Sequence, residues 1–151
     1  MMEILPKHRG IIKFLEETIL PWRKLTIGID GVDGVGKSPL ARFLSWQFSI
    51  PSVETDMFLK EGDTFPSLRY NELKNLVEFR HYRNWPIIIE GLYLLEVLDN
   101  LNINLDVLIY VTNKDFYGGD RFKKGLEEYR NEYDPIGKSD YIYKCSKEDF
   151  K

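Results

Sequence analysis

Residues 31–38 read Gly31-Val32-Asp33-Gly34-Val35-Gly36-Lys37-Ser38, a match to the phosphate-binding pattern G-x-x-x-x-G-K-[ST]. A short apolar run precedes this stretch (25–30), and apolar residues at helical spacing follow it (37–48), so it joins a buried strand to a helix. Glycines permit backbone conformations that turn successive N–H groups toward an anion, and the helix adds the positive end of its dipole. The sequence therefore predicts a loop that binds phosphate groups.

The residues of this loop predict how a bound nucleotide would be held. Lys37 would reach the β- and γ-phosphates, and Ser38 would coordinate Mg²⁺. Pro39 is unusual at the next position, because proline has no N–H to offer to the α-phosphate, although the first turn of a helix tolerates it. We therefore expect an unharmed fold and a weakened affinity for the nucleotide. The predicted nucleotide-binding residues are Gly31, Val32, Asp33, Gly34, Val35, Gly36, Lys37, Ser38 and Pro39.

Short apolar segments alternate with helical patterns along the rest of the chain. We expect strands at 25–30, 52–55, 86–90, 106–111 and 140–143, and helices at 7–20, 37–48, 69–83 and 120–132. The strands are apolar throughout rather than at every second residue, which is typical of a parallel sheet covered on both faces. Ligands of such sheets bind beyond the carboxyl ends of the strands, which directs attention to Asp30, Asp56, Glu90 and Asn113.

Two acidic residues at strand ends are candidates for chemistry. Asp56 follows the second expected strand, where its carboxylate would face the γ-phosphate and could accept the proton of an attacking hydroxyl. A turn or cap aspartate is the alternative interpretation. Glu90 ends a strand of three isoleucines, where it could serve Mg²⁺ or its water shell, and burying it there is costly unless it has a partner. The candidate metal-binding residues are Ser38, Asp56 and Glu90.

Cations near the last expected helix predict a lid over the phosphates. Lys123, Lys124 and Arg130 accompany Arg121, which we take with Lys37 and Asp56 as a candidate catalytic residue. Glutamates at 127, 128 and 132 interleave with these cations, so a salt-bridged surface helix is the alternative.

Length and composition bound the remaining possibilities. A chain of 151 residues with 43% hydrophobic residues predicts one domain spanning 1–151 with its own core. No apolar run is long enough to span a membrane, and the start at Met1 does not resemble a signal peptide. The single cysteine, Cys145, cannot form an internal disulfide, so we expect a cytoplasmic protein. A net charge of −3 gives no reason to expect nucleic acid as a partner, and the oligomeric state stays open.

With the phosphate loop, Thr55-Asp56-x-Phe58 and Ile89-Glu90-Gly91 in this order, the chain resembles the uridine kinase-like branch of the P-loop kinases from about Leu25 to Tyr143. The resemblance implies an α/β, three-layer P-loop NTPase fold with a five-stranded parallel sheet in the order 2-3-1-4-5. It also implies ATP-Mg²⁺ as phosphoryl donor, Asp56 as catalytic base, and Ser38 and Glu90 serving the metal. The segment between Asp56 and Arg69 leaves little room for the nucleoside-gripping insertion of that branch, so uridine does not follow as the substrate.

Three functional hypotheses follow from these motifs. The first is an ATP-Mg²⁺-dependent kinase acting on a nucleoside, nucleotide or other small hydroxyl acceptor. The second is a catalytically degenerate module that binds nucleotide as a sensor, which would account for Pro39 and the sparse lid. The third, a GTPase, lacks its guanine-binding motif N-K-x-D, because Phe116 stands where the aspartate is required after Asn113.

Overall fold

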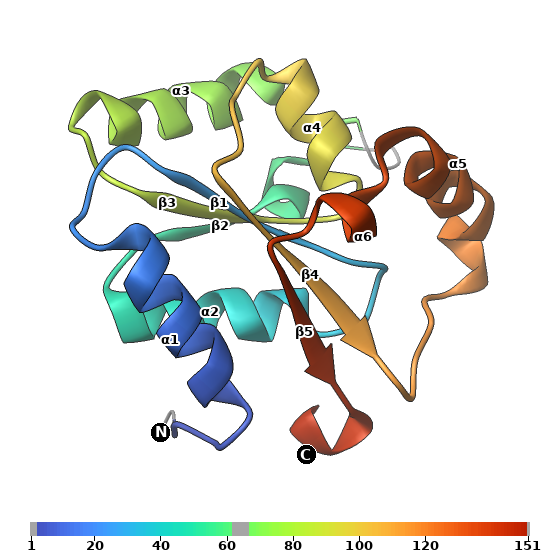
Figure 1. Cartoon of the computed structure of the whole chain (residues 1–151). Coiled ribbons are helices and arrows are strands. Elements are labelled where there is room, and N and C mark those ends of the chain that lie inside the picture. The colour runs from blue at the N-terminus through green and yellow to red at the C-terminus, as the bar shows by residue number, and fades with distance from the viewer. Residues whose placement is uncertain (1–2, 62–66, 151) are drawn as a thin grey trace.

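Five parallel strands form one sheet through the centre of the protein, in the order β2-β3-β1-β4-β5 (Figure 1). The computed structural model describes residues 3–61 and 67–150. The strands are β1 (Thr26–Asp30), β2 (Ser52–Glu54), β3 (Ile87–Glu90), β4 (Val107–Asn113) and β5 (Tyr141–Cys145). The predicted strands and their order are confirmed. The expectations about the start of the chain and about the segment between Asp56 and Arg69 fall partly outside the described residues.

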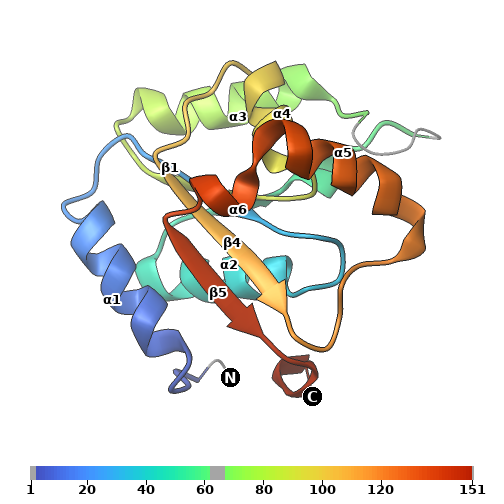
Figure 2. The ribbon, with the colours of Figure 1, turned by 45° about the vertical axis from the view of Figure 1, so that its right-hand side comes forward.

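Helices cover both faces of this sheet, which gives the predicted three layers (Figures 1 and 2). They are α1 (His8–Ile19), α2 (Lys37–Phe48), α3 (Tyr70–Tyr82), α4 (Leu94–Asn100), α5 (Lys123–Tyr133) and α6 (Pro135–Lys138), with 3₁₀ turns η1 (Thr55–Phe58), η2 (Asp120–Phe122) and η3 (Lys147–Phe150). Helices α1 and α2 pack on one face, while α3 and α4 pack on the other. The sequence analysis did not predict α4, because its seven residues are fewer than the window over which a helical period is judged, although Leu94, Val97 and Leu98 stand at helical spacing.

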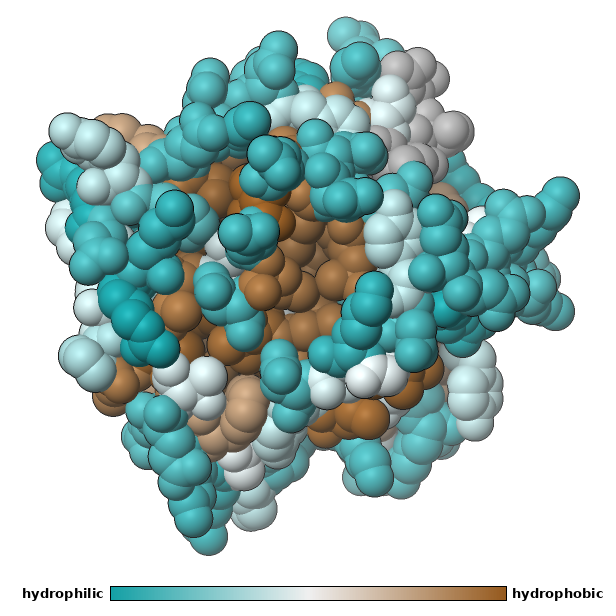
Figure 3. Space-filling view, turned by 45° about the horizontal axis from the view of Figure 1, so that its top comes forward, coloured by the Kyte–Doolittle hydropathy of each residue, from teal (hydrophilic) through white to brown (hydrophobic). Residues whose placement is uncertain are grey.

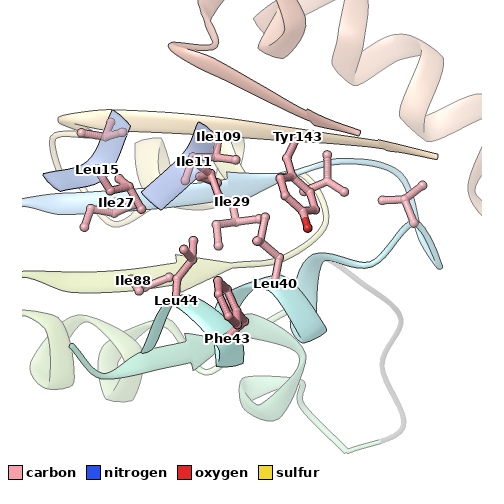
Figure 4. Packing of buried hydrophobic residues seen from close by; sticks show 14 of the residues in the cluster. Ile11, Leu15, Ile27, Ile29, Leu40, Phe43, Leu44, Ile88, Ile109 and Tyr143 are labelled. Atoms are coloured by element: carbon pink, nitrogen blue, oxygen red, sulfur yellow. The ribbon is translucent and has the colours of Figure 1, made fainter. Parts of the chain in front are cut away.

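Alternate residues of the central strands supply the two halves of the core. In β3, Ile88 joins the cluster under α1 and α2, whereas Ile87 and Ile89 join the cluster under α3 and α4. Figure 4 shows the first cluster, in which Ile11 of α1 and Leu44 of α2 lie with Ile88 of the sheet. This two-sided burial explains why the central strands are apolar at every position.

Strand β5 lies at the edge of the sheet and is covered on only one face. It buries Tyr143 and Cys145 but leaves Ile142 exposed, so its pattern alternates, unlike that of the central strands. Apolar side chains also gather at the centre of the face seen in Figure 3, with hydrophilic side chains around them. Within the two described ranges, no helix combines the length and apolar character that crossing a membrane requires.

Candidate functional site

The phosphate loop connects the carboxyl end of β1 to the first residue of α2. Gly36 caps α2 with φ 113°, in the left-handed region that glycine adopts without strain. Gly31 has φ 152°, and a Cβ there would lie 2.7 Å from the carbonyl oxygen of Val111. Both glycines are therefore required by the path of the loop around the space it encloses.

Lys37 lies within this loop rather than in solvent. Its Nζ donates to the carbonyl oxygens of Gly31 (2.9 Å) and Val32 (2.7 Å), and only 8% of the residue is exposed. Burial lowers the pKa of Lys37, and the neighbouring carboxylates of Glu90 and Asp30 oppose that effect. The ammonium group is thus held beside neutral acceptors, where an anion bound in the loop would meet it.

Ser38 and Glu90 are 52 residues apart in the sequence and are joined by a hydrogen bond. The Ser38 hydroxyl of α2 donates to Glu90 Oε1 at the end of β3, at 2.7 Å. Only 3% of Glu90 is exposed, and its burial raises the pKa of this carboxyl, while the bond from Ser38 and the charge of Lys37 act in the opposite direction. Glu90 therefore has the partner that its burial at the end of an isoleucine strand requires.

Asp56 reaches the same place from η1, directly after β2. A pocket of about 180 Å³ contains the predicted catalytic and metal-binding residues of the loop and of the ends of β2 and β3. Its lining residues are Asp33, Gly34, Lys37, Ser38, Thr55, Asp56, Glu90, Gly91 and Leu92. Within the described residues, no group of three or more His, Cys, Asp or Glu side chains is arranged to hold a metal ion. The side-chain oxygens of its lining residues are the hydroxyls of Ser38 and Thr55 and the carboxylates of Asp33, Asp56 and Glu90.

Asp30, the last residue of β1, has a role that the sequence did not predict. Its Oδ1 accepts the N–H of Gly31 at 2.7 Å, and its Oδ2 accepts the hydroxyl of Tyr129 from α5 at 2.5 Å. Tyr129 in turn accepts the N–H of Leu95 in α4 at 3.0 Å. Burial raises the pKa of Asp30 to about 6, although the bond from Tyr129 opposes this. The signal in the sequence was a carboxylate ending an apolar strand, but its partner is 99 residues away.

Asp33 joins the phosphate loop to the segment that leads into α5. Both of its carboxylate oxygens accept the N–H of Gly119, at 3.1 and 3.0 Å. Gly34 lies against the ring of Phe116, which a Cβ on Gly34 would approach to 2.6 Å. The segment before the expected lid is therefore docked on the loop.

Arg121 is the predicted catalytic residue that the structure does not bring to this pocket. It is exposed in η2, with its guanidinium 5.2 Å from the centre of the Phe122 ring. In α5, Lys124 and Glu128 form an exposed pair at 3.9 Å, as in an ordinary surface helix. The proposed lid function of these cations stays a prediction.

Pro39 does not line the pocket of Glu90 and Asp56. It is exposed in the first turn of α2, where N–H groups lack intrahelical partners, so the helix is undisturbed. Pro39 and Gly36 line a second pocket, of about 200 Å³, in which the His8 ring stacks on Phe43 with centroids 3.9 Å apart. Val32 and Val35 instead line a cavity of about 440 Å³ between the loop, β4 and α5.

Comparisons with known proteins place the fold. No family model and no curated protein matches the sequence. The solved structure of a possible uridine kinase from Bacillus stearothermophilus matches 89% of this chain and 98% of its own, with a TM-score of 0.58 at 18% identity. Shikimate kinases from Bacteroides thetaiotaomicron and Aquifex aeolicus match 80% of this chain and 86% and 85% of theirs, at 11% and 19% identity, with TM-scores of 0.46 and 0.44. The chain has the P-loop kinase-like fold that the motifs predicted.

Proposed function

We propose that this chain is an ATP-Mg²⁺-dependent kinase that transfers the γ-phosphoryl group to a small hydroxyl acceptor, such as a nucleoside or nucleotide. The observation that carries the proposal is one pocket at the carboxyl ends of β1, β2 and β3. Lys37, the Ser38–Glu90 pair and Asp56 all line it. Phosphoryl transfer needs little beyond positioning and stabilisation of charge, which is the chemistry that these residue types supply.

The residues present fit a nucleotide with Mg²⁺. Mg²⁺ takes hard oxygen ligands and commonly uses one or two carboxylates together with phosphate oxygens and water. Ser38 and Glu90 offer such oxygens, and Asp56 adds a carboxylate to the same pocket. Three of the loop glycines adopt positive φ angles, and such a backbone path favours binding of the phosphates by backbone N–H groups. When bound, Mg²⁺ neutralises charge on the phosphate oxygens.

Each side chain then has a distinct task. Lys37 exchanges the carbonyl oxygens of Gly31 and Val32 for phosphate oxygens, to which its charge is better matched. Asp56, exposed at the pocket, takes the proton of the acceptor hydroxyl as that oxygen bonds to the γ-phosphorus, and ADP leaves with the electrons of the broken bond.

The second candidate is a nucleotide-binding module without turnover. Two observations favour it: Pro39 lacks an N–H beside the loop, and Arg121 lies outside the pocket. Such a module would bind ATP-Mg²⁺ through Lys37 and the loop backbone but would consume none with any acceptor.

Consumption of ATP with a panel of nucleosides, nucleotides and small alcohols separates the two functions. Turnover that depends on one acceptor supports the kinase. In that reaction Asp56→Asn should lower turnover by a factor of about 10² to 10⁴ with ATP-Mg²⁺ affinity unchanged. Asp115→Asn is the matched control, because Asp115 follows β4 and its carboxylate accepts the N–H of Lys147 outside the pocket. Binding without turnover across the panel would refute the kinase and leave the module.

Glu90→Gln tests the metal role separately. We expect a higher Mg²⁺ concentration for half-maximal turnover in this variant, because the amide is a weaker ligand than the carboxylate. If Asp56→Asn shifts the Mg²⁺ requirement instead, Asp56 is a metal ligand and the base lies elsewhere.

A further inference from the structure

One buried side-chain oxygen has no hydrogen-bond partner among residues 3–61 and 67–150, and it is Oγ1 of Thr55. Thr55 is fully buried, with no exposed surface. Buried hydroxyls are almost always hydrogen-bonded, because an unsatisfied one loses its bonds to water and gains none. A group of this kind is therefore retained at a cost to stability, which calls for a reason.

The position of Thr55 supplies that reason. It is the first residue of η1, directly before Asp56, and it lines the pocket of Lys37, Ser38 and Glu90. The other hydroxyl in this pocket, that of Ser38, already donates to Glu90. Thr55 is thus the hydroxyl of the pocket that is left with its bonding capacity unused within the described part of the chain.

Gly91 makes the space in which this hydroxyl lies. It follows Glu90 at the end of β3, and a Cβ on Gly91 would collide with Thr55 Oγ1. The φ of Gly91 is not positive, so the backbone does not require glycine at this position. The absence of a side chain instead lets the end of β3 and the Thr55 hydroxyl approach each other at the edge of the pocket.

We propose that Thr55 is a ligand-binding residue of the phosphate site, and that its hydroxyl hydrogen-bonds the hydrated Mg²⁺–phosphate group of a bound nucleotide. This inference rests on the proposed function. The hydroxyl can donate to a phosphate oxygen or accept from a metal-bound water. Lys37 can only donate, and the ionised carboxylates of Asp56 and Glu90 can only accept. The hydroxyl therefore suits either group of the same ligand.

Thr55→Val tests the inference, because valine keeps the shape of threonine and removes only the hydroxyl. We expect an unchanged or higher Tm for the ligand-free protein, since an unsatisfied polar group is removed. We also expect ATP-Mg²⁺ to bind at least about tenfold more weakly by calorimetry, which is about 1.4 kcal/mol. A merely structural hydroxyl would not combine these two results. Thr55→Ser retains the hydroxyl and should retain most of the affinity.

Thr26→Val is the matched control. Thr26 is as fully buried as Thr55, but its hydroxyl lies 3.3 Å from Nε2 of His81, with which it shares a hydrogen bond, at the other end of the sheet. This variant should lower the Tm, because it removes an existing bond to Nε2 of His81, which keeps the carbonyl oxygen of Leu25 at 3.3 Å as its other partner. Its affinity for ATP-Mg²⁺ should match that of the unaltered protein. The two variants are therefore expected to show opposite patterns.

Titrations of ATP in EDTA and with Mg²⁺ identify the atom that Thr55 contacts. A loss of affinity in both conditions indicates a phosphate oxygen, and a loss only with Mg²⁺ indicates a metal-bound water; either supports the inference. Equal affinities of Thr55→Val and the unaltered protein would overturn it while leaving the proposed function intact, and a lower Tm with unchanged affinity would identify the hydroxyl as structural. If the unaltered protein binds no ATP-Mg²⁺, the proposed function and this inference both fall.

Discussion

The bond between Tyr129 and Asp30 should stabilise the protein by an amount that depends on pH. Tyr129→Phe removes only a hydroxyl, but that hydroxyl donates to Asp30 Oδ2 at 2.5 Å and accepts the N–H of Leu95. Asp30 is 1% exposed, so no solvent replaces the lost donor. The substitution therefore acts on the point where α5, α4 and the start of the phosphate loop meet.

The magnitude follows from the charge of the acceptor. A hydrogen bond to a charged group contributes about 1.5–3 kcal/mol, and a bond between neutral groups about 1 kcal/mol. Burial raises the pKa of Asp30 from its ordinary 3.8 to about 6, so the group is mostly ionised at pH 8 and mostly protonated at pH 5. Loss of the bond to Asp30 should thus lower the free energy of unfolding by about 2–3 kcal/mol at pH 8 and by about 1 kcal/mol at pH 5, and loss of the bond from Leu95 adds a cost that does not depend on pH.

The direction of the pH dependence follows from linkage. Because the pKa of Asp30 is higher in the folded than in the unfolded state, Asp30 makes unfolding easier as the pH rises from about 4 to 6, and this cost is complete above that range. The bond from Tyr129 favours the ionised form. Its loss raises the pKa of Asp30 further, so the cost in the variant continues to grow above pH 6.

Chemical denaturation of the unaltered protein and of Tyr129→Phe, at several pH values between 5 and 8, measures this pH dependence. Glu90, whose pKa is also raised by burial, titrates in both proteins, so its effect cancels in the difference. In an Asp30→Asn background the effect of Tyr129→Phe on the free energy of unfolding should be independent of pH, because no charge remains at residue 30. If the free energies of unfolding of Tyr129→Phe and the unaltered protein differ by the same amount from pH 5 to 8, the reasoning is refuted.

Three further predictions concern the phosphate loop. Lys37→Ala should abolish binding of ATP-Mg²⁺ in calorimetry with the circular dichroism spectrum unchanged, because its Nζ donates to loop carbonyls rather than packing in the core; normal binding would mean that the loop is not a phosphate site. Pro39→Thr should tighten ATP binding by about 0.5–1.5 kcal/mol, since it restores an N–H and a hydroxyl beside the loop, and equal or weaker affinity would contradict this. Asp33→Ala should speed hydrogen exchange at the Gly119 amide about tenfold or more, because that N–H loses both of its acceptors, and unaltered exchange would show that the docked segment is held by other contacts.

The strands and long helices were predictable because their signals are local. The residues of α2 repeat at helical spacing and are preceded by glycines, and its predicted bounds agree with the observed Lys37–Phe48. The short helix α4 was missed, because seven residues are too few for a helical period to be distinguished, even though Leu94, Val97 and Leu98 are spaced as in a helix. The sheet order came from the resemblance to P-loop kinases and not from the pattern of the strands themselves.

For the candidate site too, the sequence predicted some features and the tertiary structure decided others. That Lys37, Ser38, Asp56 and Glu90 line one pocket could be predicted from the sequence, because the carboxyl ends of parallel strands meet at one edge and a residue directly after a strand must lie there.

Only the tertiary structure decided which of these groups contact one another. The bond from Ser38 to Glu90, the bond from Tyr129 to Asp30 and the unpartnered hydroxyl of Thr55 depend on distances between elements far apart in the chain. A hydrogen bond forms within about 3 Å, and sequence spacing determines positions that accurately only within one helix or strand. The sequence by itself determined the strands, the long helices and the place of the candidate site at the ends of the strands, and packing determined the partners of each polar group.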